Sequence, residues 1–124
     1  MSAKTISPPD TRQRLRDVVA LADGRKAIDV KVLELREVCD FADFFIICTG
    51  RSSRQVQAIA EGIRRLMRDQ GERPIHIEGS RTGQWILLDY GDLVIHVFDP
   101  ETRSYYALER LWLDAPDVTA ELRG

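Results

Sequence analysis

The sequence has few of the residues that define specialised protein classes. Its two cysteines, Cys39 and Cys48, are nine residues apart, and neither belongs to a C-x-x-C pair. A disulfide scaffold or a zinc site would need more cysteines or four ligands at tighter spacing. We interpret both cysteines as small buried hydrophobes, and we expect neither a metal ion nor a cofactor.

Long hydrophobic runs are also missing. The longest candidates have the length of a strand, such as Phe44–Cys48, and a membrane-spanning helix needs roughly 20 apolar residues. Residues 1–9 lack the apolar core of a signal peptide. We therefore expect no membrane association and a place in the reducing cytoplasm.

Neither sign of charge is in large excess. The chain has 18 Lys and Arg against 20 Asp and Glu, a net charge of −2. Binding to phosphates needs a clear basic excess, so we expect no direct specific recognition of nucleic acid. The charge is uneven, because residues 1–50, 51–83 and 84–124 carry 0, +3 and −5. The acidic last third indicates either a basic partner or a solvated face.

What the chain does have is the composition of one globular domain. Its 124 residues are 44% hydrophobic, which is enough to bury a core without disulfides or bound metals. The patterns predict, in order, a helix over 11–24, strands over 28–35 and 44–48, a helix over 53–70, strands over 74–78, 85–90 and 93–98, and a helix over 100–113. This order, α-β-β-α-β-β-β-α, predicts an α/β fold with one mixed sheet of about five strands packed with helices. We expect a disordered lead at 1–9, a single domain at 10–117 and a tail at 118–124.

Local signals support the individual elements. The unbroken apolar run over 44–48 is typical of a strand covered on both faces. Ser52 or Ser53 can cap the helix that follows, and Gly71 is a plausible C′ residue. Asp99 followed by Pro100 is a strong helix start.

One set of residues favours an enzyme. Nucleotidyltransferases place a Gly-Ser turn before a strand that carries paired carboxylates for magnesium, and Gly79-Ser80 precedes Asp89 and Asp92 here. These two carboxylates are on either side of Gly91 rather than on one face of one strand. A magnesium-dependent nucleotidyltransferase-like enzyme using Asp89 and Asp92 stays as the alternative.

A second set could hold an anion. The segment 49–53 joins a strand to a helix N-terminus, where anions bind readily. It lacks the glycine pattern of dinucleotide-binding folds and the lysine of a P-loop, and a turn at Gly50 with a serine cap explains it equally well. His76 and His96 have no second ligand at i+2 or i+4, so we expect no metal there.

The hairpin over 85–98 is more informative. Alternation places Trp85, Leu87 and Asp89 on one face of the first strand, and Ile86, Leu88 and Tyr90 on the other. Both faces therefore carry large apolar groups. One face must pack on helices, and the other needs a helix, a second subunit or a partner protein. Aromatic rings beside acidic residues are typical of a binding hot spot, although ordinary core packing also explains them.

Three ordered blocks of the chain resemble the ribosomal silencing factor family, also called the iojap-related family. The blocks are Asp43–Val56, then Glu78-Gly79 with Gly83–Phe98, and Tyr106–Trp112. The likeness covers about residues 12–117. It implies an α/β domain that is distantly like nucleotidyltransferases without their catalytic carboxylates, and therefore a protein that is not an enzyme.

The resemblance also implies a function. A family member would bind the large ribosomal subunit through its fourteenth protein and block joining of the small subunit, so that translation falls when nutrients are scarce. Homodimers are common in the family, and a dimerisation adaptor for other complexes is a weaker possibility. Carried over by position, the partner-binding residues would be Trp85, Leu88, Asp89, Tyr90 and Asp92, with His96, Tyr106 and Glu109 as companions.

Overall fold

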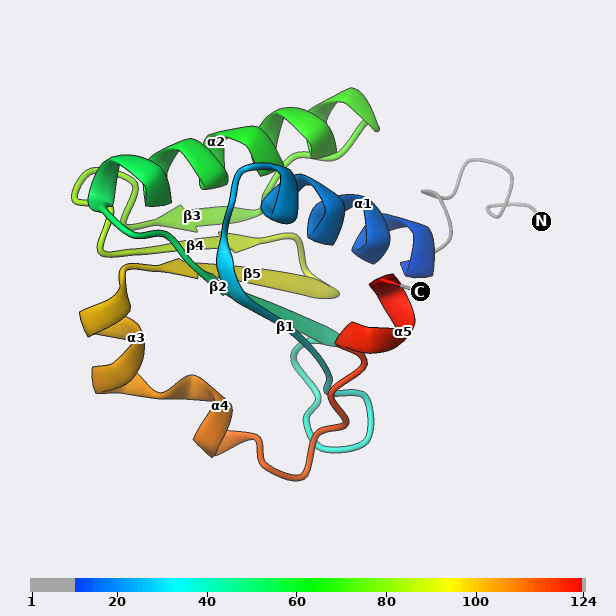
Figure 1. Ribbon diagram of the computed structural model, residues 1–124. Coiled ribbons are helices and arrows are strands. Elements are labelled where there is room, and N and C mark those ends of the chain that lie inside the picture. The colour runs from blue at the N-terminus through cyan, green and yellow to red at the C-terminus, as the bar shows by residue number, and fades with distance from the viewer. Residues whose placement is uncertain (1–10, 124) are drawn as a thin grey trace.

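Figure 1 shows the computed structural model, which describes residues 11–123 of the chain. The expected disordered lead at 1–9 lies outside the described residues. The elements in chain order are α1 (Thr11–Gly24), β1 (Ile28–Glu34), β2 (Phe44–Thr49), α2 (Ser53–Asp69), β3 (His76–Glu78), β4 (Trp85–Asp89), β5 (Leu93–Phe98), α3 (Pro100–Tyr106), α4 (Leu108–Leu111) and α5 (Thr119–Arg123). The predicted mixed α/β fold is confirmed.

The five strands form one sheet in the order β1-β2-β5-β4-β3. Neighbours run antiparallel except β2 and β5, which are parallel and central. Every residue of β2 and β5 is buried, as the unbroken apolar run predicted for β2. β4 and β5 form the predicted hairpin, whose turn contains Gly91 at a φ of +91°, a conformation that glycine adopts without strain.

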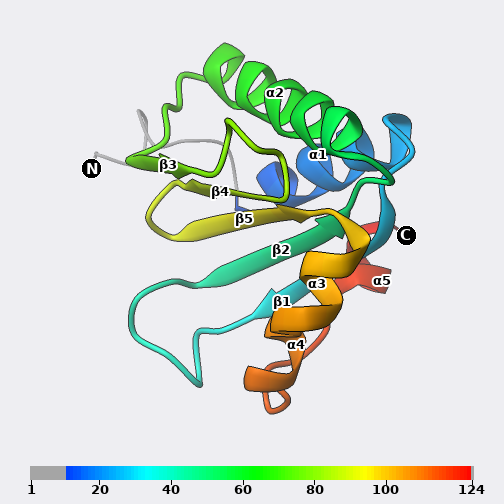
Figure 2. The same cartoon turned by 90° about the vertical axis from the view of Figure 1, so that its left-hand side faces the viewer.

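Two helices cover one face of the sheet, which we call the covered face. Figure 2 shows α1 and α2 lying over it. The α2 helix begins at the predicted cap, where the Ser52 side chain accepts a hydrogen bond from the Gln55 backbone N–H. The stripe Val56, Ile59 and Ile63 then packs against alternate residues of the strands. The result is a mainly aliphatic core that is closed to solvent.

The opposite face carries a smaller cluster and shorter helices. Its buried members are Leu33, Leu35, Ala42, Phe45, Ile47, Val94, Phe98 and Ala115. In Figures 1 and 2, α3 and α4 lie on this side of the sheet, and they span only seven and four residues. We call this side the aromatic face.

The predicted single helix over 100–113 is wrong. The helix is interrupted at Ala107, which has a left-handed backbone conformation with a φ of +46° and separates α3 from α4. The apolar spacing of Tyr106, Leu108 and Leu111 continues across the break, so periodicity could not reveal it. A buried arginine described below holds the two helices in this bent arrangement.

The segment expected as a tail contains a further helix. Leu122 of α5 packs into the covered core, and Arg123 pairs with Asp23 at 2.7 Å. The Thr119 hydroxyl accepts a hydrogen bond from the Val32 backbone N–H. Packed structure therefore continues to Arg123, the last described residue.

Over residues 11–123, no helix combines the length and the hydrophobicity that crossing a membrane would require.

Candidate functional site

A continuous series of rings crosses the aromatic face. The members of the series are Tyr105, Tyr106, Trp85, His96, Phe45, Trp112 and Phe41. Each ring has its centroid 4.6 to 6.2 Å from that of a neighbour in the series, and the distance for Phe41 is measured to Phe45. The series starts on α3, passes over β4, β5 and β2, and ends in the loop before β2. Segments far apart in the sequence thus contribute to one aromatic cluster, whose middle rings His96 and Phe45 are buried.

Both ends of this series reach solvent. Tyr105 is 81% exposed and Phe41 is 64% exposed. Leu111 and Leu113, on either side of Trp112 in the sequence, are also largely exposed. Single exposed apolar residues are common, but several gathered along one aromatic face are typical of a protein-binding surface.

Trp85 lies at the centre of the series and is half-buried. Its ring stacks on Phe98 with centroids 4.9 Å apart and leans against Tyr106 at 4.8 Å. Its indole Nε1–H donates to Nδ1 of His96 at 3.1 Å. His96 is buried, and this burial lowers the pKa of its imidazole to about 4, so the ring is neutral at neutral pH.

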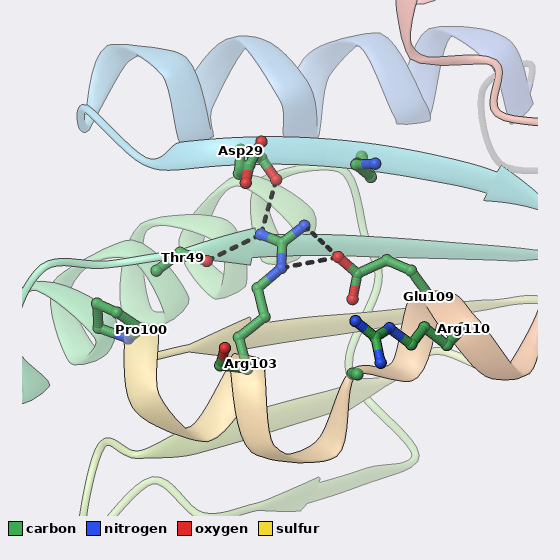
Figure 3. Close-up of a pocket in the computed structure, with 9 residues that line it drawn as sticks. Asp29, Thr49, Pro100, Arg103, Glu109 and Arg110 are labelled. Carbon is green, nitrogen blue, oxygen red and sulfur yellow. Dashed lines mark hydrogen bonds and ion pairs between the residues drawn. The ribbon is translucent and has the colours of Figure 1, made fainter.

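Arg103 fixes the helices that carry Tyr106. Its side chain is nearly buried and donates to the Asp29 carbonyl at 2.7 Å and to the Thr49 hydroxyl at 2.8 Å (Figure 3). Its Nη2 lies 2.9 Å from the Glu109 carboxylate, which joins α3 to α4 across the Ala107 break. This one guanidinium holds α3 and α4 against β1 and β2.

Glu109 therefore has a structural partner. Burial alone would raise the pKa of its carboxyl, but its own backbone N–H and the Arg103 guanidinium hold that pKa below its ordinary value. The pair lines a polar pocket of about 440 Å³ at the junction of α3 and α4, together with Lys31 and Arg110. The Glu109 carboxylate is thus used to hold Arg103 between α3 and α4.

Of the residues predicted to bind a partner, the structure brings three together. Trp85, His96 and Tyr106 form the middle of the ring series on the aromatic face. Of these three side chains, only Trp85 and Tyr106 are accessible to solvent, because His96 is 3% exposed. The one side-chain hydrogen bond of His96 within the described residues is the one it accepts from Trp85.

Two predicted residues point the other way. Leu88 is fully buried and Tyr90 is 8% exposed, and both belong to the covered core. The physical reason is strand alternation, which places Leu88 opposite Trp85 on β4. They are core residues beneath the helices and share no surface with Trp85.

The two aspartates proposed for magnesium are used for structure. Asp92 accepts hydrogen bonds from Arg14, with the shortest at 2.7 Å, and Arg14 also pairs with Glu72. Asp89 accepts the Gly91 backbone N–H in the hairpin turn at 2.8 Å. Among the described residues, no group of three or more His, Cys, Asp or Glu side chains could hold a metal ion. This arrangement does not favour the enzyme alternative.

The sequence reasoning missed several residues of the aromatic surface. Phe41 and Tyr105 are exposed rings of the series, and Phe45 and Trp112 lie within it. Leu111 and Leu113 are exposed on either side of Trp112 in the sequence. The available signal was weak, because Leu111 and Leu113 fell within the single helix predicted over 100–113, which the structure replaces with α3 and the short α4.

Comparisons with known proteins agree on one family. A family model described as "Ribosomal silencing factor during starvation" matches residues 8–123. A "Ribosomal silencing factor RsfS" of Halalkalibacterium halodurans is 42% identical over 113 residues, which are 91% of this chain and 95% of that protein.

More distant relatives and solved structures extend the comparison. The mouse protein named "Mitochondrial assembly of ribosomal large subunit protein 1" is 31% identical, and the match covers 77% of this chain and 43% of that protein. A crystal structure of a protein from Chromobacterium violaceum superposes with a TM-score of 0.80 at 30% identity, and the match covers 83% of this chain and 86% of that one. The similarity thus extends over sequence and fold alike.

Proposed function

The chain belongs to the ribosomal silencing factor family, and from that premise we propose that it represses translation without catalysis. It docks on the large ribosomal subunit through that subunit's fourteenth protein. Once bound, it sterically prevents the small subunit from joining, so that translation falls when nutrients are limiting. The place of action is the cytoplasm, and the coarser assignment, a ribosome-associated silencing factor, follows from the family itself.

The observation that carries the proposal is the aromatic face. A steric repressor needs a surface that binds one protein firmly and makes or breaks no bond. A half-buried Trp surrounded by other rings, Tyr among them, has the composition of a binding hot spot. Here the Trp85 ring contacts the rings of Tyr106 and Phe98. Leu111, five residues after Tyr106 in the sequence, is exposed.

Charge supports the same surface. Residues 84–124 carry a net charge of −5. Exposed acidic residues also adjoin exposed apolar side chains in the sequence, with Asp40 beside Phe41 and Asp114 beside Leu113. A basic partner would be attracted to such a rim, and the association rate would fall as salt is added. A ribosomal protein with a basic surface fits this requirement.

We also propose that the chain forms a homodimer. The exposed apolar side chains of the aromatic face are a surface that a second copy could cover in the free protein. Light scattering across a concentration series tests this: a particle of twice the chain mass is expected. A monomer at every concentration would contradict it.

The main test is co-sedimentation with isolated ribosomal subunits. The chain is expected to sediment with the large subunit only, to inhibit joining of the small subunit, and to bind the purified fourteenth protein directly. Tyr105→Ala, which removes an 81% exposed ring, should weaken binding, whereas Arg65→Ala, at a 64% exposed side chain on α2, should not. Failure to sediment with the large subunit at low salt would contradict the proposal.

A further inference from the structure

The hydrogen bond between Trp85 and His96 fixes where the imidazole carries its proton. An indole N–H can only donate, so Nδ1 of His96, 3.1 Å from Trp85 Nε1, must accept and has no proton. Burial lowers the pKa of this imidazole to about 4, and the neutral ring then has its single proton on Nε2. His96 is thereby restricted to one tautomer.

The other ring nitrogen has no partner. Nε2 of His96 is buried and makes no hydrogen bond with any residue that the structure describes. A buried N–H without an acceptor costs free energy, and an apolar side chain of similar size avoids that cost. For packing alone, Leu would serve at least as well among the rings of Phe45, Trp85 and Phe98. The polar function of His96 is therefore directed at Trp85.

Few other contacts fix the orientation of the Trp85 indole. It is half-buried on a face that short helices cover incompletely, and its ring otherwise packs against the rings of Phe98 and Tyr106. Ring contacts tolerate sliding and tilting more readily than a hydrogen bond does. The bond to His96 selects one orientation of the indole before a partner arrives, which reduces the ordering cost of binding.

We propose that His96 is a positioning residue: its Nδ1 holds the Trp85 indole in the orientation that docks, while His96 itself never touches the partner. This inference rests on the proposed function and changes the role expected for His96 from contact residue to support. Loss of the acceptor should weaken docking by about fivefold to tenfold, the size expected when one large side chain must be ordered on binding.

The first test compares two substitutions of His96 in the full chain. His96→Leu removes the acceptor, whereas His96→Gln keeps a side-chain oxygen that can accept the indole N–H. The Leu variant should bind the large subunit about fivefold to tenfold more weakly with unchanged or higher thermal stability, and the Gln variant should recover most of the affinity. Ile95→Leu, a volume-conserving change on the covered side of β5, is the matched control and should bind like wild type.

The second test is spectroscopic and does not depend on the ribosome. Nitrogen-15 NMR of the histidine rings at neutral pH should show His96 with an unprotonated Nδ1 and a protonated Nε2. The Trp85 indole proton, assigned with the help of Trp112→Phe, should shift upfield in His96→Leu.

Any one of three results would overturn the proposal. The first is wild-type affinity in His96→Leu, and the second is a protonated Nδ1 in the wild-type chain. The third is an equal loss of affinity in Ile95→Leu, which would reduce His96 to ordinary packing. A wild-type chain that fails to bind the large subunit would contradict the proposed function instead, and the tautomer would still be decided by NMR.

Discussion

Against α1 and α2 the sheet presents mostly aliphatic side chains that are almost fully buried. The side of α3 and α4 carries the ring series instead, and its rings outside the sheet, Tyr105, Tyr106 and Phe41, reach solvent. The first side has two long helices and a closed core, and the second has short helices joined at a left-handed residue. Close packing on the covered face supplies stability. The aromatic face is packed less completely, and its exposed side chains are available for binding a partner.

The largest expected effect comes from truncating the covered face. Leu88→Ala removes a fully buried side chain beneath the helices and should lower the free energy of unfolding by about 4 kcal/mol, from lost transfer free energy and a cavity. Denaturant titration measures this loss. The folded molecules should still bind the large subunit with wild-type affinity, because Leu88 has no exposed surface.

The same substitution on the aromatic face is the matched control. Leu111 is 69% exposed, so Leu111→Ala should change the free energy of unfolding by at most about 0.5 kcal/mol and should weaken docking instead. If Leu111→Ala destabilised the fold as much as Leu88→Ala does, the two faces would not differ as described.

The stability of the chain should also depend on pH, through His96 on the aromatic face, by an amount close to the loss expected for Leu88→Ala. The pKa of His96 falls from an ordinary 6.5 to about 4 in the folded chain. Between these values the unfolded chain binds the proton and the folded chain does not, so stability is complete above pH 6.5 and is lost as the pH falls toward 4. The loss from this group should reach about 3 kcal/mol, at about 1.4 kcal/mol per pH unit.

Urea titrations from pH 7 to pH 4.5 would measure this dependence, with His96→Leu as the reference that lacks the group. The variant should lose less stability than wild type over this range. Identical curves above pH 5 would show that the imidazole is not held neutral.

Truncation of the central ring should separate binding from folding. Trp85→Ala should cost about 2 kcal/mol of docking free energy, or about thirtyfold in affinity, as expected for a hot-spot aromatic. Affinity for the large subunit is the measurement, with circular dichroism to establish that the variant is folded. A folded Trp85→Ala chain that binds like wild type would exclude Trp85 from the docking surface.

The smallest expected effect concerns the break between α3 and α4. Ala107 has a φ of +46°, which costs an alanine about 1 kcal/mol and costs glycine little. Ala107→Gly should therefore raise the free energy of unfolding by up to about 1 kcal/mol, measured by thermal unfolding. A decrease would indicate that the unfolded chain's extra freedom outweighs the relief of strain.

Continuous local patterns made most of the fold predictable. The apolar run of β2, the stripe and cap of α2, and the 85–98 hairpin each carry their signal within a few residues. The break at Ala107 could not be read, because it depends on Arg103 reaching Asp29, Thr49 and Glu109 across the fold. Helix α5 is five residues long and is stabilised by tertiary contacts rather than by its own pattern.

The candidate site was predictable only in part. Alternation already placed Leu88 and Tyr90 opposite Trp85, so that signal could have removed them from a shared surface. The contact of Trp85 with His96 depends on the pairing of β4 with β5, where Leu87 lies opposite His96, and sequence alone does not set that register. Phe41 joins the surface through a loop whose path no periodic pattern describes.

The central claim, that the aromatic face docks and the covered face does not, is tested most directly by hydrogen–deuterium exchange of the chain alone and bound to the large subunit. The account predicts slower exchange on binding over residues 36–43 and 105–113, with the exposed side of α2 over residues 53–69 unchanged. Slower exchange confined to α2, with 105–113 exchanging as in the free chain, would contradict it.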